Sequence, residues 1–98
     1  MKNISVIGSG TMGNGIAHLF AQHHFEVALV DLSPDQLQKG MATIAKNMDR
    51  QIAKGTLTEA DKAASLNRIS PFTSLADGVK NSDLVVEAAT EKIEIKLD

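Results

Sequence analysis

One stretch near the start of the chain constrains the fold more than any other. An apolar run, Ile4–Ile7, is followed by Gly8, Gly10 and Gly13 at the spacing G-x-G-x-x-G. A helical pattern and a second apolar run come next, and the second run ends at Asp31, eighteen residues after the last of these glycines. This order predicts strand, glycine turn, helix and strand, which is the context that the glycine motif requires.

The glycines and the acid each suit one part of a dinucleotide. Gly8 permits a tight turn out of the strand, Gly10 leaves room for a pyrophosphate beside the backbone, and Gly13 lets the helix lie close to the sheet. The helix N-terminus offers unpaired N–H groups and a positive dipole end to the phosphates. Asp31 can accept both hydroxyls of an adenosine ribose, and its charge would repel a 2′-phosphate. No Lys or Arg lies between Asp31 and Lys39, so the sequence favours NAD over NADP.

Length and composition narrow the alternatives. A complete dinucleotide-binding unit has two βαβαβ halves, so we expect residues 1–98 to form one NAD-binding domain, truncated before its second half. A net charge of −2 and only three aromatic residues argue against a nucleic-acid partner. The absence of cysteine excludes disulfides and thiolate metal sites. No apolar run is long enough to span a membrane, and Met1 closely precedes the first strand, so we expect a cytoplasmic protein without a membrane partner.

The rest of the chain completes the half-sheet. Ser33 and Pro34 predict a helix start, with Gln36 completing a capping box, and Lys54-Gly55 predicts the end of that helix. A second helix from Thr58 to about residue 67 would make a helical hairpin. The later segments predict an edge strand in 68–73, a short helix or turn in 75–80, a fourth strand in 83–88 and a helix in 91–98. The fold class is therefore α/β, a Rossmann-type parallel sheet, first half, in strand order 3-2-1-4 with a helical hairpin after strand 2.

Four more specific expectations concern the first helix and the sheet edge. The helix should turn its apolar side chains towards the sheet, namely Ile16, Ala17, Leu19, Phe20 and Ala21. His24 should take a left-handed backbone conformation where the helix ends. His18, His23 and His24 are assigned neither catalysis nor metal binding, because no carboxylate partner is evident near them. Residues 84–86 should form an unpaired apolar edge that invites self-association.

Two motifs together resemble the 3-hydroxyacyl-CoA dehydrogenase family, close to its short-chain 3-hydroxybutyryl-CoA members. They are Ile7-Gly8-Ser9-Gly10-Thr11-Met12-Gly13-Asn14-Gly15-Ile16-Ala17 and Leu84-Val85-Val86-Glu87-Ala88-Ala89-Thr90-Glu91-Lys92-Ile93-Glu94-Ile95-Lys96. The long helix ending at Lys54-Gly55 and the pair Val30-Asp31 also match, so the resemblance covers essentially the whole chain. The resemblance implies reversible NAD-linked oxidation of a 3-hydroxyacyl-CoA to a 3-ketoacyl-CoA, in fatty acid and butanoate metabolism.

The resemblance also implies roles for individual residues. The segment from Gly8 to Gly13, which includes Ser9, Gly10, Thr11 and Met12, would hold the pyrophosphate. Asp31 would bind the adenosine ribose, Glu91 and Lys96 would contact the cofactor, and Lys54 would reach the CoA portion of the substrate. Lys92 stands where many members have asparagine. The catalytic histidine, its glutamate partner and a helical dimerisation domain lie, in the family, beyond the residues of this chain, so no catalytic residue is assigned here. In the complete enzyme the resemblance implies an acyl-CoA substrate and a homo-oligomer.

Two other interpretations remain open from the residues. The chain could be the cofactor half of another β-hydroxyacid or sugar-acid dehydrogenase, or of a crystallin-like relative without an acyl-CoA site. It could also be a freestanding or remnant NAD-binding module without catalysis. The helical hairpin in 33–67 favours an acyl-CoA enzyme over the first of these, whereas the short length would favour the second if Asp98 were a true terminus.

Overall fold

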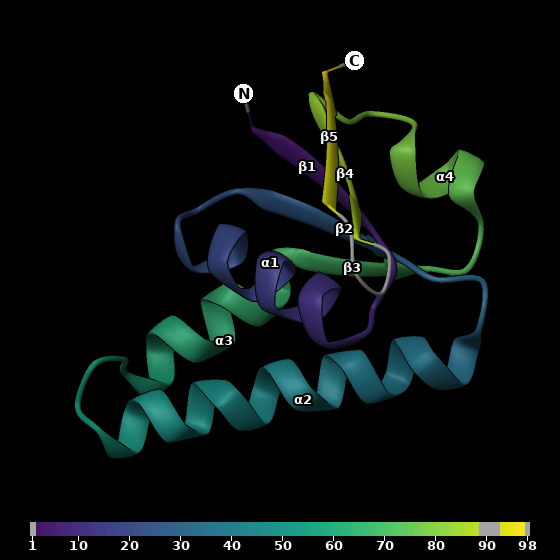
Figure 1. Cartoon of the computed structure of the whole chain (residues 1–98). Helices are drawn as coiled ribbons and strands as arrows, with labels where there is room; N and C mark the ends of the chain where they lie inside the picture. The colour runs from purple at the N-terminus through teal and green to yellow at the C-terminus, as the bar shows by residue number, and fades with distance from the viewer. Residues whose placement is uncertain (1, 89–92, 98) are drawn as a thin grey trace.

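The computed structural model describes residues 2–88 and 93–97 as a single sheet flanked by helices. The sheet has the order β3-β2-β1-β4-β5 (Figure 1). The parallel strands are β1 (Asn3–Ile7), β2 (Glu26–Val30), β3 (Ile69–Phe72) and β4 (Leu84–Ala88), and β5 (Ile93–Leu97) runs antiparallel to β4. The first four strands confirm the predicted order 3-2-1-4.

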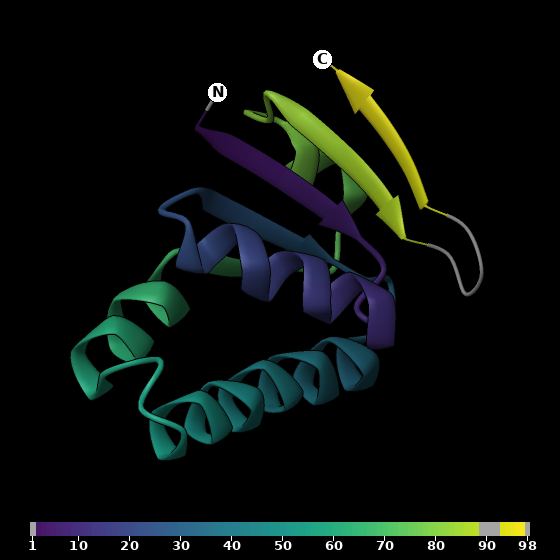
Figure 2. The same cartoon turned by 60° about the vertical axis from the view of Figure 1, so that its left-hand side comes forward.

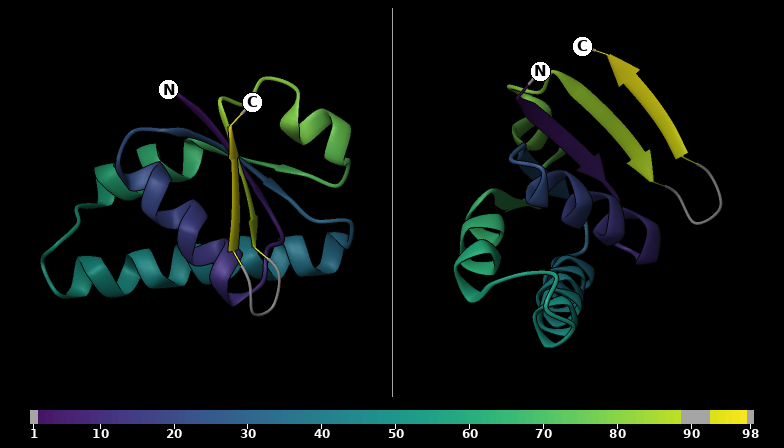
Figure 3. Two further views of the ribbon diagram at one scale, coloured as in Figure 1. Left: turned by 45° about the horizontal axis from the view of Figure 1, so that its top comes forward. Right: turned by 90° about the vertical axis from the view of Figure 1, so that its left-hand side faces the viewer.

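The helices lie on both faces of the sheet. On one face, α1 (Thr11–Gln22) lies between the sheet and the hairpin of α2 (Pro34–Ala53) and α3 (Glu59–Asn67) (Figures 2 and 3). The short α4 (Leu75–Val79) packs on β1, β2 and β3 from the other face. The predicted helical hairpin after strand 2 is therefore confirmed. In the described part of the chain, no helix combines the length and apolarity needed to cross a membrane.

The core lies between the sheet and α1 and continues to α2. It contains Ile4, Val6, Leu29 and Val86 of the sheet, Ala17 and Ala21 of α1, and Ile44 and Met48 of α2. Ile16 and Phe20 are partly buried against it, as predicted. The prediction for Leu19 is wrong, because its side chain is 57% exposed. Successive helical residues are about 100° apart, so a residue two positions from Ala17 lies on nearly the opposite side of the helix.

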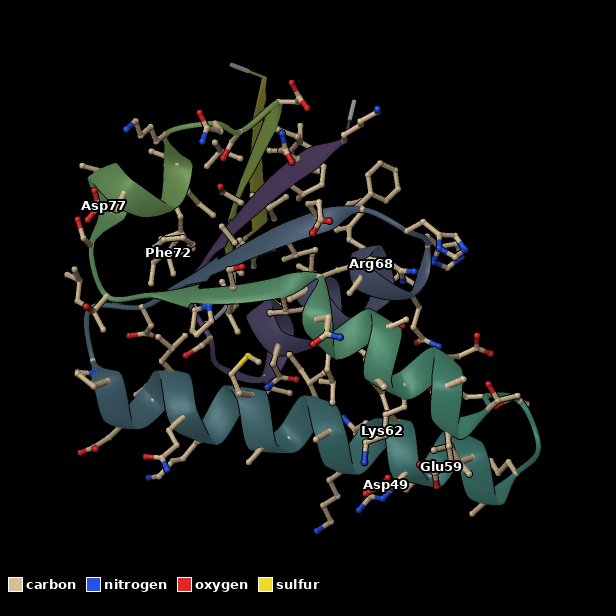
Figure 4. The ribbon with its side chains drawn as sticks, turned by 180° about the vertical axis from the view of Figure 1, so that it is seen from behind. Asp49, Glu59, Lys62, Arg68, Phe72 and Asp77 are labelled. Carbon is tan, nitrogen blue, oxygen red and sulfur yellow. The ribbon has the colours of Figure 1, made fainter. Side chains whose placement is uncertain are left out.

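The helical hairpin begins and ends at the predicted residues. The Ser33 hydroxyl accepts the N–H of Gln36, and the Thr58 hydroxyl accepts the N–H of Asp61. Gly55 follows α2 with φ of 78° and donates its N–H to the Ile52 carbonyl, which confirms the left-handed stop. Lys62 of α3 pairs with Asp49 of α2 at 2.6 Å, and their side chains point towards each other in Figure 4.

The end of α1 confirms the prediction for His24. His24 has φ of 70° and donates its N–H to Ala21 O, while Phe25 donates its N–H to Phe20 O. These two bonds form a Schellman motif, and the Phe20 and Phe25 rings make its apolar contact with centroids 5.4 Å apart. Arg68, the C-cap of α3 directly before β3, adds a hydrogen bond from Nη1 to Ala21 O at 2.8 Å (Figure 4). The helix end is therefore closed by backbone, aromatic and guanidinium contacts.

We expect His24→Gly to raise the free energy of unfolding by up to about 1 kcal/mol, because glycine adopts positive φ without the steric cost that a Cβ imposes. His24→Val should lower it by about 1 to 2 kcal/mol, since a branched Cβ suits this conformation least. Urea denaturation of the three proteins measures both changes. A valine variant as stable as the unmodified chain would contradict the expectation.

Asp83 fixes the start of β1 beside the start of β4. Its Oδ2 accepts the N–H groups of Lys2 and Asn3, each at 2.9 Å, and its own N–H donates to Asn3 O. The hydrogen bond from Asn3, followed by that from Lys2, holds the pKa of the Asp83 carboxyl below its ordinary value. Both strands therefore begin at one carboxylate.

Asp83 should make the stability of the chain sensitive to acid. Because its folded pKa is depressed, its contribution is complete above the unfolded pKa, near 4, and is lost as the pH falls through the folded pKa. We expect Asp83→Ala to destabilise the chain near neutral pH and to have less effect at pH 2. Thermal unfolding at several pH values tests this. An equal effect at both extremes would show that the carboxylate charge is not involved.

The prediction of a helix in 91–98 is wrong where the structure describes this segment. Residues 93–97 form β5, with Ile93 opposite Ala88 and Leu97 opposite Leu84. Their sequence, Ile-Glu-Ile-Lys-Leu, alternates apolar and charged residues, which is the period of a strand, and isoleucine favours strands. The expected unpaired edge at residues 84–86 is wrong for the same reason, because β5 pairs with β4 along it. The edge of the described sheet on that side is β5.

Candidate nucleotide-binding site

The glycine turn joins β1 to α1 and is held by three neighbouring elements. Gly8 has φ of 100° and donates its N–H to Val30 O, at the end of β2, at 2.7 Å. A Cβ on Gly8 would lie 2.5 Å from the carbonyl oxygen of Ala88, at the end of β4. A Cβ on Gly13 of α1 would lie 1.6 Å from Gly8 O. Both glycines are therefore required by the protein's own packing.

The N-terminus of α1 differs from the other helix starts. Ser33, Thr58 and Ser74 each cap a helix with a side-chain oxygen, whereas the N-cap of α1 is Gly10, which makes no such bond. The backbone of Gly10 begins the helix in the ordinary way, because its carbonyl accepts the N–H of Asn14 at 2.9 Å. The first amides of α1 therefore have no side-chain cap. Such amides are the donors that a phosphate group accepts at a helix N-terminus.

Asp31 follows β2 and faces the same turn. Its Oδ2 accepts the Ser9 N–H at 3.0 Å and the Ser9 hydroxyl at 2.8 Å, and its Oδ1 accepts the Ser33 N–H at 3.0 Å. Partial burial is the largest single influence on the pKa of Asp31 and raises it, but the bonds from Ser33 and Ser9 together outweigh it and lower the pKa. The carboxylate is therefore ionised and oriented at neutral pH.

A hollow of about 350 Å³ lies over the turn and brings most of the predicted cofactor residues together. Its lining includes Gly8, Ser9, Gly10, Thr11, Met12, Gly13 and Asp31, with Gln36 of α2 and Ala88 of β4. A second hollow of about 260 Å³ shares Gly8 and Asp31 with the first. The two hollows therefore meet at the glycine turn and the acid.

The second hollow contains residues that sequence reasoning missed. Besides the shared pair it is lined by Ile7, Val30, Leu32 and Leu75. Leu32 is 79% exposed and Leu75 is 47% exposed, so two exposed apolar side chains border this hollow. The position of Leu32, directly after the acid at a strand end, could have indicated that it lines the site. Leu75 gave no such signal, because only the packing of α4 brings it here.

The other predicted site residues lie elsewhere. Lys54 is the C-cap of α2, fourteen residues beyond Gly40, which lies against Ser9. At 1.5 Å per residue it is roughly 21 Å further along the helix. Lys96 belongs to β5, opposite Val85, and Glu91 falls outside the described residues. The structure therefore gathers the glycine turn and Asp31 and does not place Lys54 beside them.

The histidines lie away from both hollows. His18 Nε2 hydrogen-bonds Gln51 Oε1 at 2.9 Å, and His23 Nδ1 bonds Leu19 O at 2.8 Å. Neither they nor His24 line the hollows at the glycine turn. Within residues 2–88 and 93–97, no group of three His, Cys, Asp or Glu side chains is placed to hold a metal ion. His18 therefore links α1 to α2, and His23 bonds the last turn of α1.

The four parallel strands, the glycine turn at their switch point and the acid after β2 define a Rossmann-type dinucleotide-binding protein. A family profile described as "3-hydroxyacyl-CoA dehydrogenase, NAD binding domain" matches residues 3–98. The chain belongs to this family, and its cofactor is accordingly NAD.

Named relatives agree with the family. The chain is 48% identical over 96 residues to a 3-hydroxybutyryl-CoA dehydrogenase of Bradyrhizobium diazoefficiens, covering 98% of this chain and 32% of that protein. It is 36% identical to the 3-hydroxyadipyl-CoA dehydrogenase of Escherichia coli over 98% of this chain and 20% of that one. The crystal structure of (S)-3-hydroxybutyryl-CoA dehydrogenase from Ralstonia eutropha superposes with a TM-score of 0.88 at 49% identity, covering 94% of this chain and 32% of that one. The chain thus spans about a third or less of the length of these relatives.

Proposed function

We propose that this chain binds NAD(H) as the cofactor-binding part of an NAD-dependent 3-hydroxyacyl-CoA dehydrogenase. The observation that carries the proposal is the hollow over the glycine turn, because it joins an uncapped helix N-terminus to an ionised carboxylate. These are the two features that recognise a pyrophosphate and a ribose. The room beside Gly10 also fits the cofactor, since a Cβ there would meet no protein atom within 4 Å.

Each part of the cofactor has candidate partners in this chain. The backbone from Gly8 to Gly13 would hold the pyrophosphate, with Ser9, Gly10, Thr11 and Met12 in that lining. Asp31 would accept a hydroxyl of the adenosine ribose. The exposed apolar side chains of Leu32 and Leu75 offer surfaces on which the adenine can pack. Glu91 and Lys96 are proposed as further cofactor contacts, and Lys54 as a contact of the CoA portion, on the family resemblance.

The reaction proposed for the whole protein is oxidation of a 3-hydroxyacyl-CoA, with a short acyl chain, to the 3-ketoacyl-CoA. NAD, when bound, accepts the hydride from the carbon that bears the hydroxyl. Residues 1–98 would bind and orient the cofactor, while a general base elsewhere in the protein would take the hydroxyl proton. The names of the three relatives above, each a dehydrogenase of a 3-hydroxyacyl-CoA, favour this over another β-hydroxyacid dehydrogenase. A cytoplasmic location and a homo-oligomeric assembly are part of the proposal.

Asp31 provides the direct test of cofactor choice. We expect the chain to bind NAD(H) more tightly than NADP(H) by roughly tenfold or more, because two like charges near a protein surface repel by about 1 to 4 kcal/mol at 4 Å. Asp31→Ser should reduce or reverse this preference, since it removes both the ribose acceptor and the repelling charge. Calorimetric titration with both nucleotides measures it. Equal affinities of the unmodified chain would refute the assignment of Asp31.

A further inference from the structure

Ser9 contributes a side chain to the glycine turn, whose other proposed contacts with the cofactor are made by backbone groups. Its side chain is nearly buried, with 2% of the residue exposed. The Oγ donates to Asp31 Oδ2 at 2.8 Å, and the Ser9 N–H donates to the same oxygen at 3.0 Å. Any amino acid except proline would supply the second bond at this position, whereas the first requires a hydroxyl. The contact between Ser9 and Asp31 is therefore specific to the residue found here.

These bonds determine which part of the carboxylate is free. A carboxylate oxygen offers two lone-pair positions, so two donors from Ser9 fill Oδ2. Oδ1 accepts only the Ser33 N–H among the hydrogen bonds found within residues 2–88 and 93–97, which leaves it an acceptor position. The carboxylate is held at both oxygens and cannot rotate without breaking a bond. It can therefore present Oδ1 to a ribose hydroxyl without first being ordered.

The packing around Ser9 suits a small side chain. A Cβ on Gly40 of α2 would lie 2.7 Å from Ser9 O and 3.0 Å from Ser9 Cβ. The backbone of α2 therefore closes one side of Ser9 while Asp31 occupies another. Both the glycine in α2 and the serine in the turn fit this close approach. Ser9→Ala is accordingly the smallest change that removes the hydroxyl without altering the packing.

We propose that Ser9 is a positioning residue for the adenosine ribose of NAD: its hydroxyl fixes the Asp31 carboxylate in the orientation that accepts the ribose. The inference rests on the proposed function, because it concerns the same nucleotide site. Ser9 acts through Asp31 and does not itself accept the ribose hydroxyl. Its contribution to affinity therefore exists only while the carboxylate is present.

A double-mutant cycle on the 98-residue chain tests the proposal. Ser9→Ala should raise the dissociation constant for NAD about 3- to 10-fold. This loss is smaller than the full contribution of a hydrogen bond to a charged group, because the bond orients the carboxylate and does not contact NAD. In an Asp31→Ala background the same change should alter the dissociation constant by less than about twofold, because the partner is gone. In the free protein, Ser9→Ala should also raise the pKa of the Asp31 carboxyl. The ¹³C chemical shift of that carboxyl, recorded during a pH titration, measures the change.

Ser33→Ala is the matched control. Ser33 also contacts Asp31, but through its backbone N–H, which alanine retains. Losing its hydroxyl removes the cap of α2 and should lower the melting temperature, as expected when a helix loses its cap. The dissociation constant for NAD should stay within about twofold of that of the unmodified chain.

The outcomes separate the inference from the proposed function. Failure of the unmodified chain to bind NAD would overturn the proposed function and, with it, the role of Ser9 in ribose binding. Where NAD binds, an unchanged dissociation constant in Ser9→Ala would overturn the inference alone. An equal loss of affinity with and without Asp31 would do the same, because Ser9 would then act by another route. An unchanged Asp31 titration would show that the hydroxyl does not hold the carboxylate.

Discussion

Gly10→Ala is expected to weaken NAD binding by at least about tenfold while leaving the fold intact. A Cβ at this position meets no protein atom within 4 Å, and Gly10 has φ of −66°, which alanine adopts readily. The free energy of unfolding should therefore change by no more than about 1 kcal/mol, the cost of a poorer N-cap. The same Cβ would stand in the lining of the hollow where the pyrophosphate is proposed to approach the backbone. Calorimetric titration and urea denaturation measure the two effects separately.

Two other glycines of the same helix provide controls for Gly10→Ala. Gly13→Ala should lose both binding and stability, by about 3 kcal/mol, because its Cβ would lie 1.6 Å from Gly8 O and force the turn to shift. Gly15→Ala should lose neither, since its Cβ meets nothing within 4 Å and alanine favours a helix. Only Gly10 should separate affinity from stability. Unchanged NAD affinity in Gly10→Ala would show that the pyrophosphate does not lie against this backbone.

Local signals in the sequence were sufficient for the parallel part of the fold and for the core of the site. Glycine spacing, the acid at a strand end and helix caps are encoded within a few residues of where they act. The turn at Gly8, the cap at Ser33 and the left-handed His24 could therefore be predicted. The hollow joins the predicted turn residues to Asp31 because both follow the carboxyl ends of adjacent parallel strands.

Contacts between distant residues could not be predicted in the same way. Ser5 interrupts the apolar run of β1, and its hydroxyl donates to Gly78 O of α4 at 2.7 Å and pairs with the Ser82 hydroxyl. Gly40 of α2 lies against Ser9 of the glycine turn, although the two residues are far apart in the sequence. The strand β5 depends on a partner as well as on its own pattern, since alternating residues become a strand where a sheet edge is available. Such features follow from tertiary packing, which no short window of sequence contains.

The position of the histidines bears on what the chain can catalyse. Oxidation of a hydroxyl requires a base within hydrogen-bond reach of its proton as hydride leaves for the nicotinamide. Among the residues that line the two hollows, none is a histidine. His18 hydrogen-bonds Gln51 on the side of α1 that faces the helical hairpin. His23 bonds Leu19 O at the C-terminal end of α1. Among the described residues, no histidine therefore lines the proposed cofactor site.

We accordingly expect the 98-residue chain to produce no measurable NADH from 3-hydroxybutyryl-CoA and NAD, even where it binds the nucleotide. A chimera in which this chain replaces the matching third of the Bradyrhizobium diazoefficiens relative should regain turnover, because the two sequences are 48% identical over the 96 residues that would be exchanged. Absorbance at 340 nm follows both reactions. A folded chimera that binds NAD without turnover would contradict the proposed role of this chain. Turnover by the short chain alone would show that His18, His23, His24 or another residue here acts as the base.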